Sequence, residues 1–239
     1  DIGMAYHDSG RLETEQIRQI FQEAFECIWR GDMENDGFNR LVIRAHLAWR
    51  EVVILRIYCK YLLQTGFPFS QAYMERAMSR QPQIASLLVS LFNAYFNPED
   101  RSSWDERIPI LEESLQQSLD AVPNLDEDRI LRRFFMLLKA TLRTNYFQRG
   151  ADGDPKEYIS VKLDPTLIPD LPRPTPAYEV FVYSPRVEGV HLRGGKVARG
   201  GIRWSDRRED FRTEVLGLMK AQQVKNAVIV PVGSKGGFF

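Results

Sequence analysis

The composition changes abruptly after Phe147, and this change constrains the fold more than any other feature. From about residue 12 to residue 147, apolar residues recur at three- and four-residue steps, which predicts a series of amphipathic helices. The next stretch opens with the turn-forming run 150–155 and holds six prolines within about two dozen residues, which excludes long helices there. The chain is therefore expected to combine a helical part with a strand-containing part.

The helical part is predicted to contain six helices. Gly31 is suited to end the first, because glycine adopts the left-handed conformation that closes a helix. Ser70 is suited to cap a later helix, and Pro82 to open the next. The expected ranges are about 12–30, 38–64, 70–79, 84–96, 104–122 and 125–147.

After the proline-rich stretch, short alternating runs predict strands at 158–163, 178–183 and 190–192. The last forty residues then suggest a strand–helix–strand order, with a helix at 208–225 and a strand at 227–230 that is buried on both faces. The predicted fold class is α+β, with an all-helical domain at 1–150 and a strand-rich part at 151–239. Both ends of the chain are expected to be cuts through a longer polypeptide.

The charge balance argues against nucleic-acid and membrane partners. Lys+Arg and Asp+Glu both number 32, so no net field recruits a polyanion or an anionic membrane. No apolar run approaches the roughly 20 residues that a spanning helix requires, and no signal peptide is expected at the first residues. Cys27 and Cys59 are expected to be free buried thiols in a reducing cytoplasm, and His46 has no partner at metal-ligand spacing.

Three segments near the C-terminal end carry the residues most suited to chemistry. Arg199 precedes a glycine pair, and its forked guanidinium is suited to bind a carboxylate. Gln222 and Lys225 are three positions apart, which places an amide and an ammonium on one helix face. Lys235 stands among glycines after the predicted buried strand, where ligands of α/β sheets gather. Together they predict a pocket for a small dianion.

Crowding by Lys225 and Arg199 in a partly dry cleft is expected to favour the neutral amine of Lys235, which can then act as a general base. Each segment alone has a plain structural explanation, because a glycine pair is usually only a turn. The run 233–237 also lacks the spacing of a P-loop. The combined order and spacing carry the functional hypothesis.

The segment 199–237 resembles the substrate-binding stretch of the glutamate/leucine/phenylalanine/valine dehydrogenase superfamily. That pattern has Lys-Gly-Gly-x-Arg, a helix ending in Gln-x-x-Lys, and a strand followed by Pro-x-Gly-Gly-x-Lys-Gly-Gly. The sequence of residues 183–207 is similar to that of the large bacterial NAD-specific glutamate dehydrogenases. The resemblance is close over about residues 176–239, and the helical block is consistent with the region that precedes their catalytic domain.

The resemblance implies a role for each residue that matches the pattern. Lys235 matches the catalytic lysine, and Gln222 and Lys225 match residues that hold the substrate α-carboxylate. Arg199 stands where smaller members of the superfamily carry a lysine for the distal carboxylate, so that carboxylate is either gripped differently or Arg199 serves the backbone instead. The proline-to-lysine interval that ends at Lys235 is one residue shorter than usual, which affects the placement of the lysine.

The implied reaction is the NAD-dependent oxidative deamination of L-glutamate to 2-oxoglutarate and ammonium, in a full-length homo-oligomer. The resemblance implies that residues 151–239 are the incomplete N-terminal part of an α/β catalytic domain. No Gly-x-Gly-x-x-Gly occurs, so NAD is expected to be bound by a domain absent from this chain, and the chain alone is expected not to turn over. Two alternatives remain, a sibling dehydrogenase for an apolar amino acid and a helical regulatory or assembly module.

Overall fold

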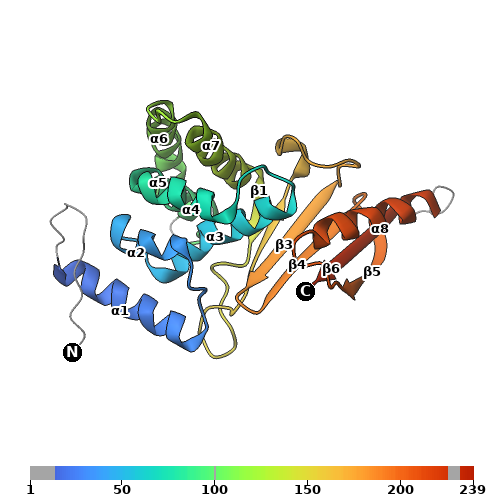
Figure 1. Cartoon of the computed structure of the whole chain (residues 1–239), viewed down its shortest axis with the longest axis horizontal. Helices are drawn as coiled ribbons and strands as arrows, with labels where there is room; N and C mark the ends of the chain where they lie inside the picture. Colours follow the sequence, from blue (N-terminus) through green and yellow to red (C-terminus); the bar gives the residue numbers. More distant parts are fainter. Residues whose placement is uncertain (1–13, 100, 226–231) are drawn as a thin grey trace.

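The computed structural model describes residues 14–99, 101–225 and 232–239. Within these residues, a layer of helices packs beside a twisted six-stranded sheet, and one further helix lies across the far end of the sheet (Figure 1). This arrangement confirms the predicted combination of a helical region followed by a sheet-containing region. No helix among the described residues is long and apolar enough to cross a membrane.

The helical region follows the sequence pattern at most of its boundaries. Gly31 ends the first helix with a φ of +78°, and the Ser70 hydroxyl accepts a hydrogen bond from the Tyr73 amide at 3.3 Å. Pro82 is the first residue of its helix, as expected. The helices are α1 (Thr14–Arg30), α2 (Arg40–Arg44), α3 (Trp49–Gln64), α4 (Gln71–Arg80), α5 (Pro82–Phe96), α6 (Arg101–Asp120) and α7 (Leu125–Ala140), with a 3₁₀ turn η1 (Gly37–Asn39).

Two predicted helices were too long. The range 38–64 is interrupted after α2, because His46 adopts a positive φ of +53° and Ala48 is extended. The carboxylate of Glu51 then accepts a hydrogen bond from the Ala48 amide at 2.9 Å, which begins α3. The range 125–147 ends early, because Thr141 is extended and its hydroxyl bonds Leu137 O at 2.8 Å. The chain continues as a strand.

The sheet has the strand order β1-β2-β3-β4-β6-β5. The pairs β1–β2, β2–β3, β3–β4 and β4–β6 are antiparallel, and the last pair, β6–β5, is parallel. The strands predicted at 158–163, 178–183 and 190–192 are confirmed with small shifts of their ends. The elements are β1 (Thr141–Thr144), β2 (Ile159–Leu163), β3 (Tyr178–Ser184), β4 (Val187–Arg193), β5 (Ala198–Trp204) and β6 (Val232–Phe238), with a 3₁₀ turn η2 (Pro165–Leu167) and helix α8 (Phe211–Lys225).

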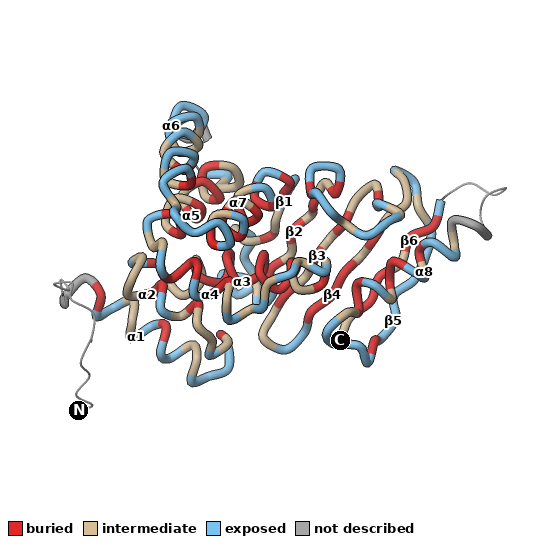
Figure 2. Tube along the Cα trace, turned by 45° about the horizontal axis from the view of Figure 1, so that its top comes forward, coloured by how far each residue is buried: buried red, intermediate tan, exposed pale blue. Residues whose placement is uncertain are grey.

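One face of the sheet is covered by α3 and α8. Phe181 of β3 packs between Tyr61 of α3 and Phe211 of α8, with ring centroids 5.6 and 6.5 Å away. The buried residues of the helices and of this sheet face form one continuous core (Figure 2). Burial of this apolar surface joins the helical and strand-rich parts. The division at residue 150 remains a prediction.

The last strand is predicted at 227–230, with the glycine-rich run 231–237 after it, and this is wrong for residues 232–237. These residues belong to β6, which pairs with β4 on one side and with β5 on the other. Backbone hydrogen bonds to two neighbours stabilise a strand that glycine alone does not favour. The predicted strand at 227–230 lies outside the described residues.

A buried polar network ties the helices to the β3–β4 hairpin. The Lys60 ammonium of α3 lies 2.9 Å from Glu34 Oε2 and 3.6 Å from Glu188 Oε1 of β4. The Tyr183 hydroxyl of β3 donates to Glu34 Oε1 at 2.9 Å. Burial raises the pKa of Glu188, and the nearby Lys60 only partly offsets this.

We expect Glu188→Gln to stabilise the chain more at pH 7 than at pH 4. A carboxyl whose folded pKa is raised contributes most when protonated, and this contribution is lost as the pH rises through the folded pKa. Urea unfolding at both pH values measures the difference, with Glu157→Gln as the control because that side chain is 86% exposed. An equal effect of Glu188→Gln at the two pH values would contradict this expectation.

Candidate functional site

Strands β5 and β6 run parallel and carry two of the predicted site residues. Their register pairs Arg199 with Gly233 and Gly201 with Lys235. Because side chains alternate between the faces of a strand, Arg199 and Lys235 emerge from the same face, two residues apart along neighbouring strands. Arg199 is exposed and Lys235 is half-buried. Strand pairing therefore brings these two cationic residues to one side of the sheet.

Helix α8 packs on that same side. A Cβ atom on Gly233 would lie 2.6 Å from Gln222 Cβ, and one on Gly237 would collide with the Val215 side chain. The end of α8 therefore lies over the start of β6, and its beginning lies over the end of β6. The glycines of β6 allow this close approach, because any larger residue at these positions would push the helix away.

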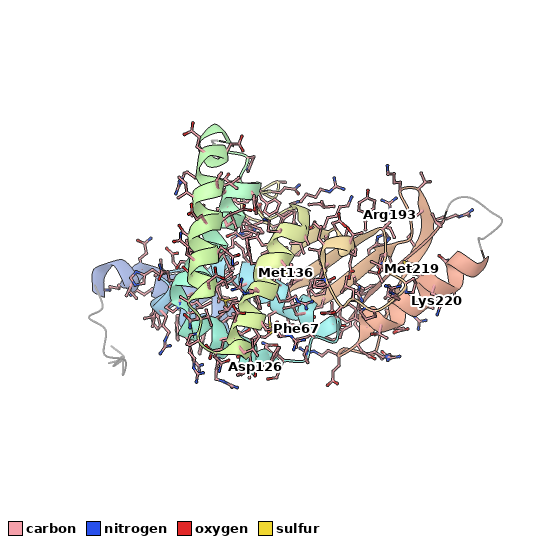
Figure 3. All side chains as sticks on the ribbon, turned by 90° about the horizontal axis from the view of Figure 1, so that it is seen from above. Phe67, Asp126, Met136, Arg193, Met219 and Lys220 are labelled. Carbon is pink, nitrogen blue, oxygen red and sulfur yellow. The ribbon has the colours of Figure 1, made fainter. Side chains whose placement is uncertain are left out.

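The two sides of α8 differ in burial. In Figure 3, Met219 and Lys220 mark this helix beside the sheet. The Met219 side chain is fully buried and the Lys220 side chain is exposed. The helix therefore has one face on the sheet and one in solvent, and its sheet-facing side carries Gln222 toward β5 and β6.

Gln222 bridges the backbones of β5 and β6. In the amide orientation that satisfies its hydrogen bonds, Gln222 Nε2 donates to Arg199 O at 3.2 Å and to Ser234 O at 3.1 Å. The amide oxygen then remains as an acceptor. Gln222 thus joins the backbone segments that carry Arg199 and Lys235. Lys225 is the last residue of α8, and its side chain lies outside the described residues.

Arg203 of β5 carries a second guanidinium that would suit a distal carboxylate. Its side chain instead lies 3.3 Å from Glu214 of α8, whose other oxygen accepts a hydrogen bond from the Ser205 hydroxyl at 2.6 Å. The guanidinium is therefore already neutralised by a carboxylate of the protein. Arg199 remains the distal-carboxylate candidate of this pair.

A separate cavity of about 790 Å³ lies at the other end of the sheet, between α1, α3, the loop after β1 and the β3–β4 hairpin. Trp49, Arg50 and Tyr158 are among its lining residues, and none of the predicted site residues lines it. The cavity is therefore distinct from the region where β5, β6 and α8 meet. In the part of the chain that the structure describes, no cluster of His, Cys, Asp and Glu is suited to bind a metal ion.

Sequence reasoning missed the polar residues that hold α8 in place. Arg212, in the first turn of α8, forms a fully buried ion pair with Glu179 of β3, and Gln64 of α3 contacts the same turn. No local spacing signals these contacts, because the partners are far apart in the sequence. Once Arg212 is known to be buried, the high free-energy cost of burying an unpaired charge indicates that it needs a carboxylate partner.

The close packing of α8 on β6 leads to a test on glycines. We expect Gly233→Ala to destabilise the chain by roughly 1–3 kcal/mol, because its Cβ would overlap the Gln222 side chain. The control is Gly217→Ala, since Gly217 lies on the exposed face of α8 and a methyl group there would meet no atom within 4 Å. That control is expected to stabilise the chain by about 0.5–1 kcal/mol. Chemical denaturation measures both, and an unchanged Gly233→Ala variant would contradict the packing argument.

Comparison with known proteins assigns the chain to a family. A family model described as the bacterial NAD-glutamate dehydrogenase catalytic domain matches residues 114–239. The chain belongs to this family. A second model, the glutamate dehydrogenase helical motif 3, matches residues 33–98. The first match covers β5, α8 and β6, and the second covers α2 to α5 of the helical region.

Relatives of the bacterial NAD-glutamate dehydrogenase family match the chain along most or all of its length. The NAD-specific glutamate dehydrogenase of Halomonas elongata is 55% identical over 238 residues and covers 100% of the chain. The proteins of the same name are 54% identical over 244 residues in Pseudomonas aeruginosa and 56% identical over 220 residues in Mycobacterium tuberculosis, covering 100% and 91% of the chain. The chain spans 14% to 15% of the length of these relatives.

Proposed function

We propose that the full-length protein catalyses the NAD-dependent oxidative deamination of L-glutamate to 2-oxoglutarate and ammonium. The family assignment supports this activity, since the matched relatives are named NAD-specific glutamate dehydrogenases. The observation that carries the proposal is the convergence of Arg199 and Lys235 on one sheet face, beside Gln222 of α8. The guanidinium of Arg199 suits a carboxylate of the substrate, and the neighbouring amine of Lys235 suits proton transfer with the same substrate.

In this proposal each residue has one role. Arg199 binds the distal carboxylate, and Lys225 binds the α-carboxylate with the help of Gln222. The amine of Lys235 takes a proton from the water that attacks the iminium carbon, and water addition then leads to release of ammonium. Alignment of both carboxylates fixes Cα relative to the amine, which lowers the barrier by orientation.

NAD would supply the acceptor for the hydride that leaves Cα. The sequence of this chain has no Gly-x-Gly-x-x-Gly, so its residues do not fit a Rossmann site, and we assign NAD to another domain of the full-length protein. Accordingly, the 239-residue chain alone is expected to show no glutamate-dependent NADH production. We further propose a cytoplasmic homo-oligomer without nucleic-acid or membrane partners.

Substrate preference is tested by Arg199→Met in the full-length enzyme. We expect the variant to lose roughly 10- to 10²-fold in kcat/KM for L-glutamate, because the distal carboxylate loses its charge partner and a charge-assisted hydrogen bond worth about 1.5–3 kcal/mol. Activity toward L-leucine is expected to change little or to rise. Steady-state assays of NADH formation with both substrates measure the ratio. A wild-type enzyme that prefers L-leucine would identify a sibling dehydrogenase instead.

A second candidate is that the helical region serves regulation or assembly. The match of residues 33–98 to a helical motif of glutamate dehydrogenases favours this role for that part of the chain. Deletion of the helical block from the full-length enzyme separates the two roles, with oligomeric state and activity as the readouts. Continued turnover with a changed oligomeric state would support an assembly role.

A further inference from the structure

The start of α8 is held by an ion pair in the interior of the protein. Arg212 Nε and Nη2 lie 2.6 and 2.8 Å from the two carboxylate oxygens of Glu179 on β3, and both side chains have 0% exposure. Burial opposes the charge of the guanidinium, yet Glu179 outweighs this effect and raises the pKa of Arg212. The pair therefore stays ionised and forms a two-pronged contact with one allowed orientation.

The helical region also contacts the first turn of α8. Gln64 is the last residue of α3, and its Oε1 accepts a hydrogen bond from the Arg212 amide at 3.2 Å. Its Nε2 donates to Arg208 O at 2.9 Å. The Arg212 guanidinium also lies 6.0 Å from the centre of the Tyr61 ring of α3. The first turn of α8 is thus fixed from the sheet by Glu179 and from the helical region by Gln64.

A gain in stability is a poor explanation for the contacts of Arg212 with Glu179 and Gln64. The desolvation of a buried ion pair offsets most of its Coulomb attraction, and apolar replacements of similar volume are often equally stable. The pair is also not fully satisfied, since Arg212 Nη1 and the Tyr61 hydroxyl have no hydrogen-bond partner among the described residues. A directional contact that adds little stability is best explained by the orientation that it enforces.

The strand directly beneath α8 does little to set the orientation of the helix. Beneath it, β6 presents Gly233 and Gly237, which have no side chains to interlock with the apolar face of the helix. Burial of apolar surface against these glycines holds α8 on the sheet. Because this interaction is not directional, it only weakly restrains translation of α8 along the sheet or rotation about its first turn. The Arg212–Glu179 ion pair adds a directional restraint at the start of α8, beside the contacts of Glu214 with Arg203 and Ser205.

The other end of α8 carries the candidate site. Gln222 follows Arg212 by ten residues, which corresponds to about 15 Å along a helix. A swing of about 10° at Arg212 would move Gln222 by roughly 2.6 Å over that length, more than enough to break its bonds to Arg199 O and Ser234 O. Misplacement of a reacting group by about 1 Å can already lower a rate by about 10²-fold.

We infer that Arg212, held by Glu179 and Gln64, is a positioning residue that sets the alignment of Gln222 with the β5–β6 backbone and thereby orients glutamate. This inference rests on the proposed function. It also gives the helical region an indirect role in catalysis, because Gln64, which helps to hold Arg212, belongs to α3. The inference concerns substrate geometry, so it predicts altered kinetics in variants that remain folded.

The test compares two matched arginines in the full-length enzyme. Arg56 of α3 is also fully buried, donates through Nε and Nη2 to Asp36 at 2.7 and 2.8 Å, and has an unpartnered Nη1 among the described residues. Its hydrogen-bond partners all lie in the segment 34–39, away from α8.

Arg212→Lys and Arg56→Lys are therefore expected to lower the melting temperature by similar amounts. We expect kcat/KM for glutamate to fall at least tenfold in Arg212→Lys and less than twofold in Arg56→Lys, with KM for NAD unchanged in both.

A second variant keeps the inference testable if Arg212→Lys does not fold. The double variant Glu179→Leu with Arg212→Met removes both charges and is expected to keep the melting temperature of the wild type while kcat/KM for glutamate falls at least fivefold. Wild-type kinetics in this stable double variant, or equal kinetic losses in both lysine variants, would overturn the positioning role. Failure of the proposed function is distinguishable, because the wild type and Arg56→Lys would then show no glutamate oxidation.

Discussion

Replacement of Lys235 by methionine is expected to lower kcat for glutamate oxidation by the full-length enzyme by roughly 10²- to 10⁴-fold. This range is what a positioned general base contributes. Lys235 is half-buried on the α8 side of β6 and shares a sheet face with Arg199, and its amine is the base in the proposed mechanism. Methionine retains much of the length of the side chain, so the strand and its glycine contacts are expected to remain intact.

The matched control for Lys235 is Lys220→Met. Lys220 lies on α8 in the same part of the molecule, but its side chain is exposed on the face that is turned away from the sheet (Figure 3). Its removal is expected to change kcat by less than twofold. Pre-steady-state measurement of NADH formation separates the chemical step from product release. Wild-type rates in Lys235→Met would show that another residue is the base.

Replacement of Asp36 by alanine is expected to destabilise the chain by roughly 3–5 kcal/mol, the usual cost of removing one partner of a buried ion pair. The Arg56 side chain has 0% exposure and bonds Asp36 through two nitrogens, so its charge would be left in the core without a carboxylate. Asp36 also accepts a hydrogen bond from the Phe38 amide at 3.0 Å, which caps the 3₁₀ turn η1.

The control for Asp36 is Asp120→Ala, which removes an acid from an ion pair with Arg132. The Asp120 side chain is 61% exposed, and Arg132 keeps its ion pair with Asp128 at 2.7 Å. Exposed pairs contribute little to stability, so the control is expected to cost much less than Asp36→Ala. Equilibrium unfolding in urea measures both variants. A loss below about 1 kcal/mol for Asp36→Ala would mean that water reaches Arg56 and replaces the carboxylate.

The glycines near the C-terminal end predict one feature of the fold and leave another unpredicted. Their number predicts close backbone approach, and the structure confirms this where α8 meets Gly233 and Gly237. It does not reveal that β6 is a strand, because glycine has low strand propensity and the hydrogen bonds that hold β6 come from β4 and β5. The segments that carry the candidate site lie together in the fold, although the secondary structure predicted for one of them was wrong.

The local pattern of residues determined most helix boundaries, the strands between the proline-rich turns, and the set of residues that carry the functional hypothesis. These features depend on neighbours in the chain: apolar spacing, caps at Ser70 and Pro82, and turn residues. Only the tertiary structure decided that Arg199 and Lys235 share a sheet face, that Arg203 is neutralised by Glu214, and that Arg212 is paired with Glu179. These contacts join distant or separately folded segments, and their energies come from strand pairing and burial, which a linear pattern does not specify.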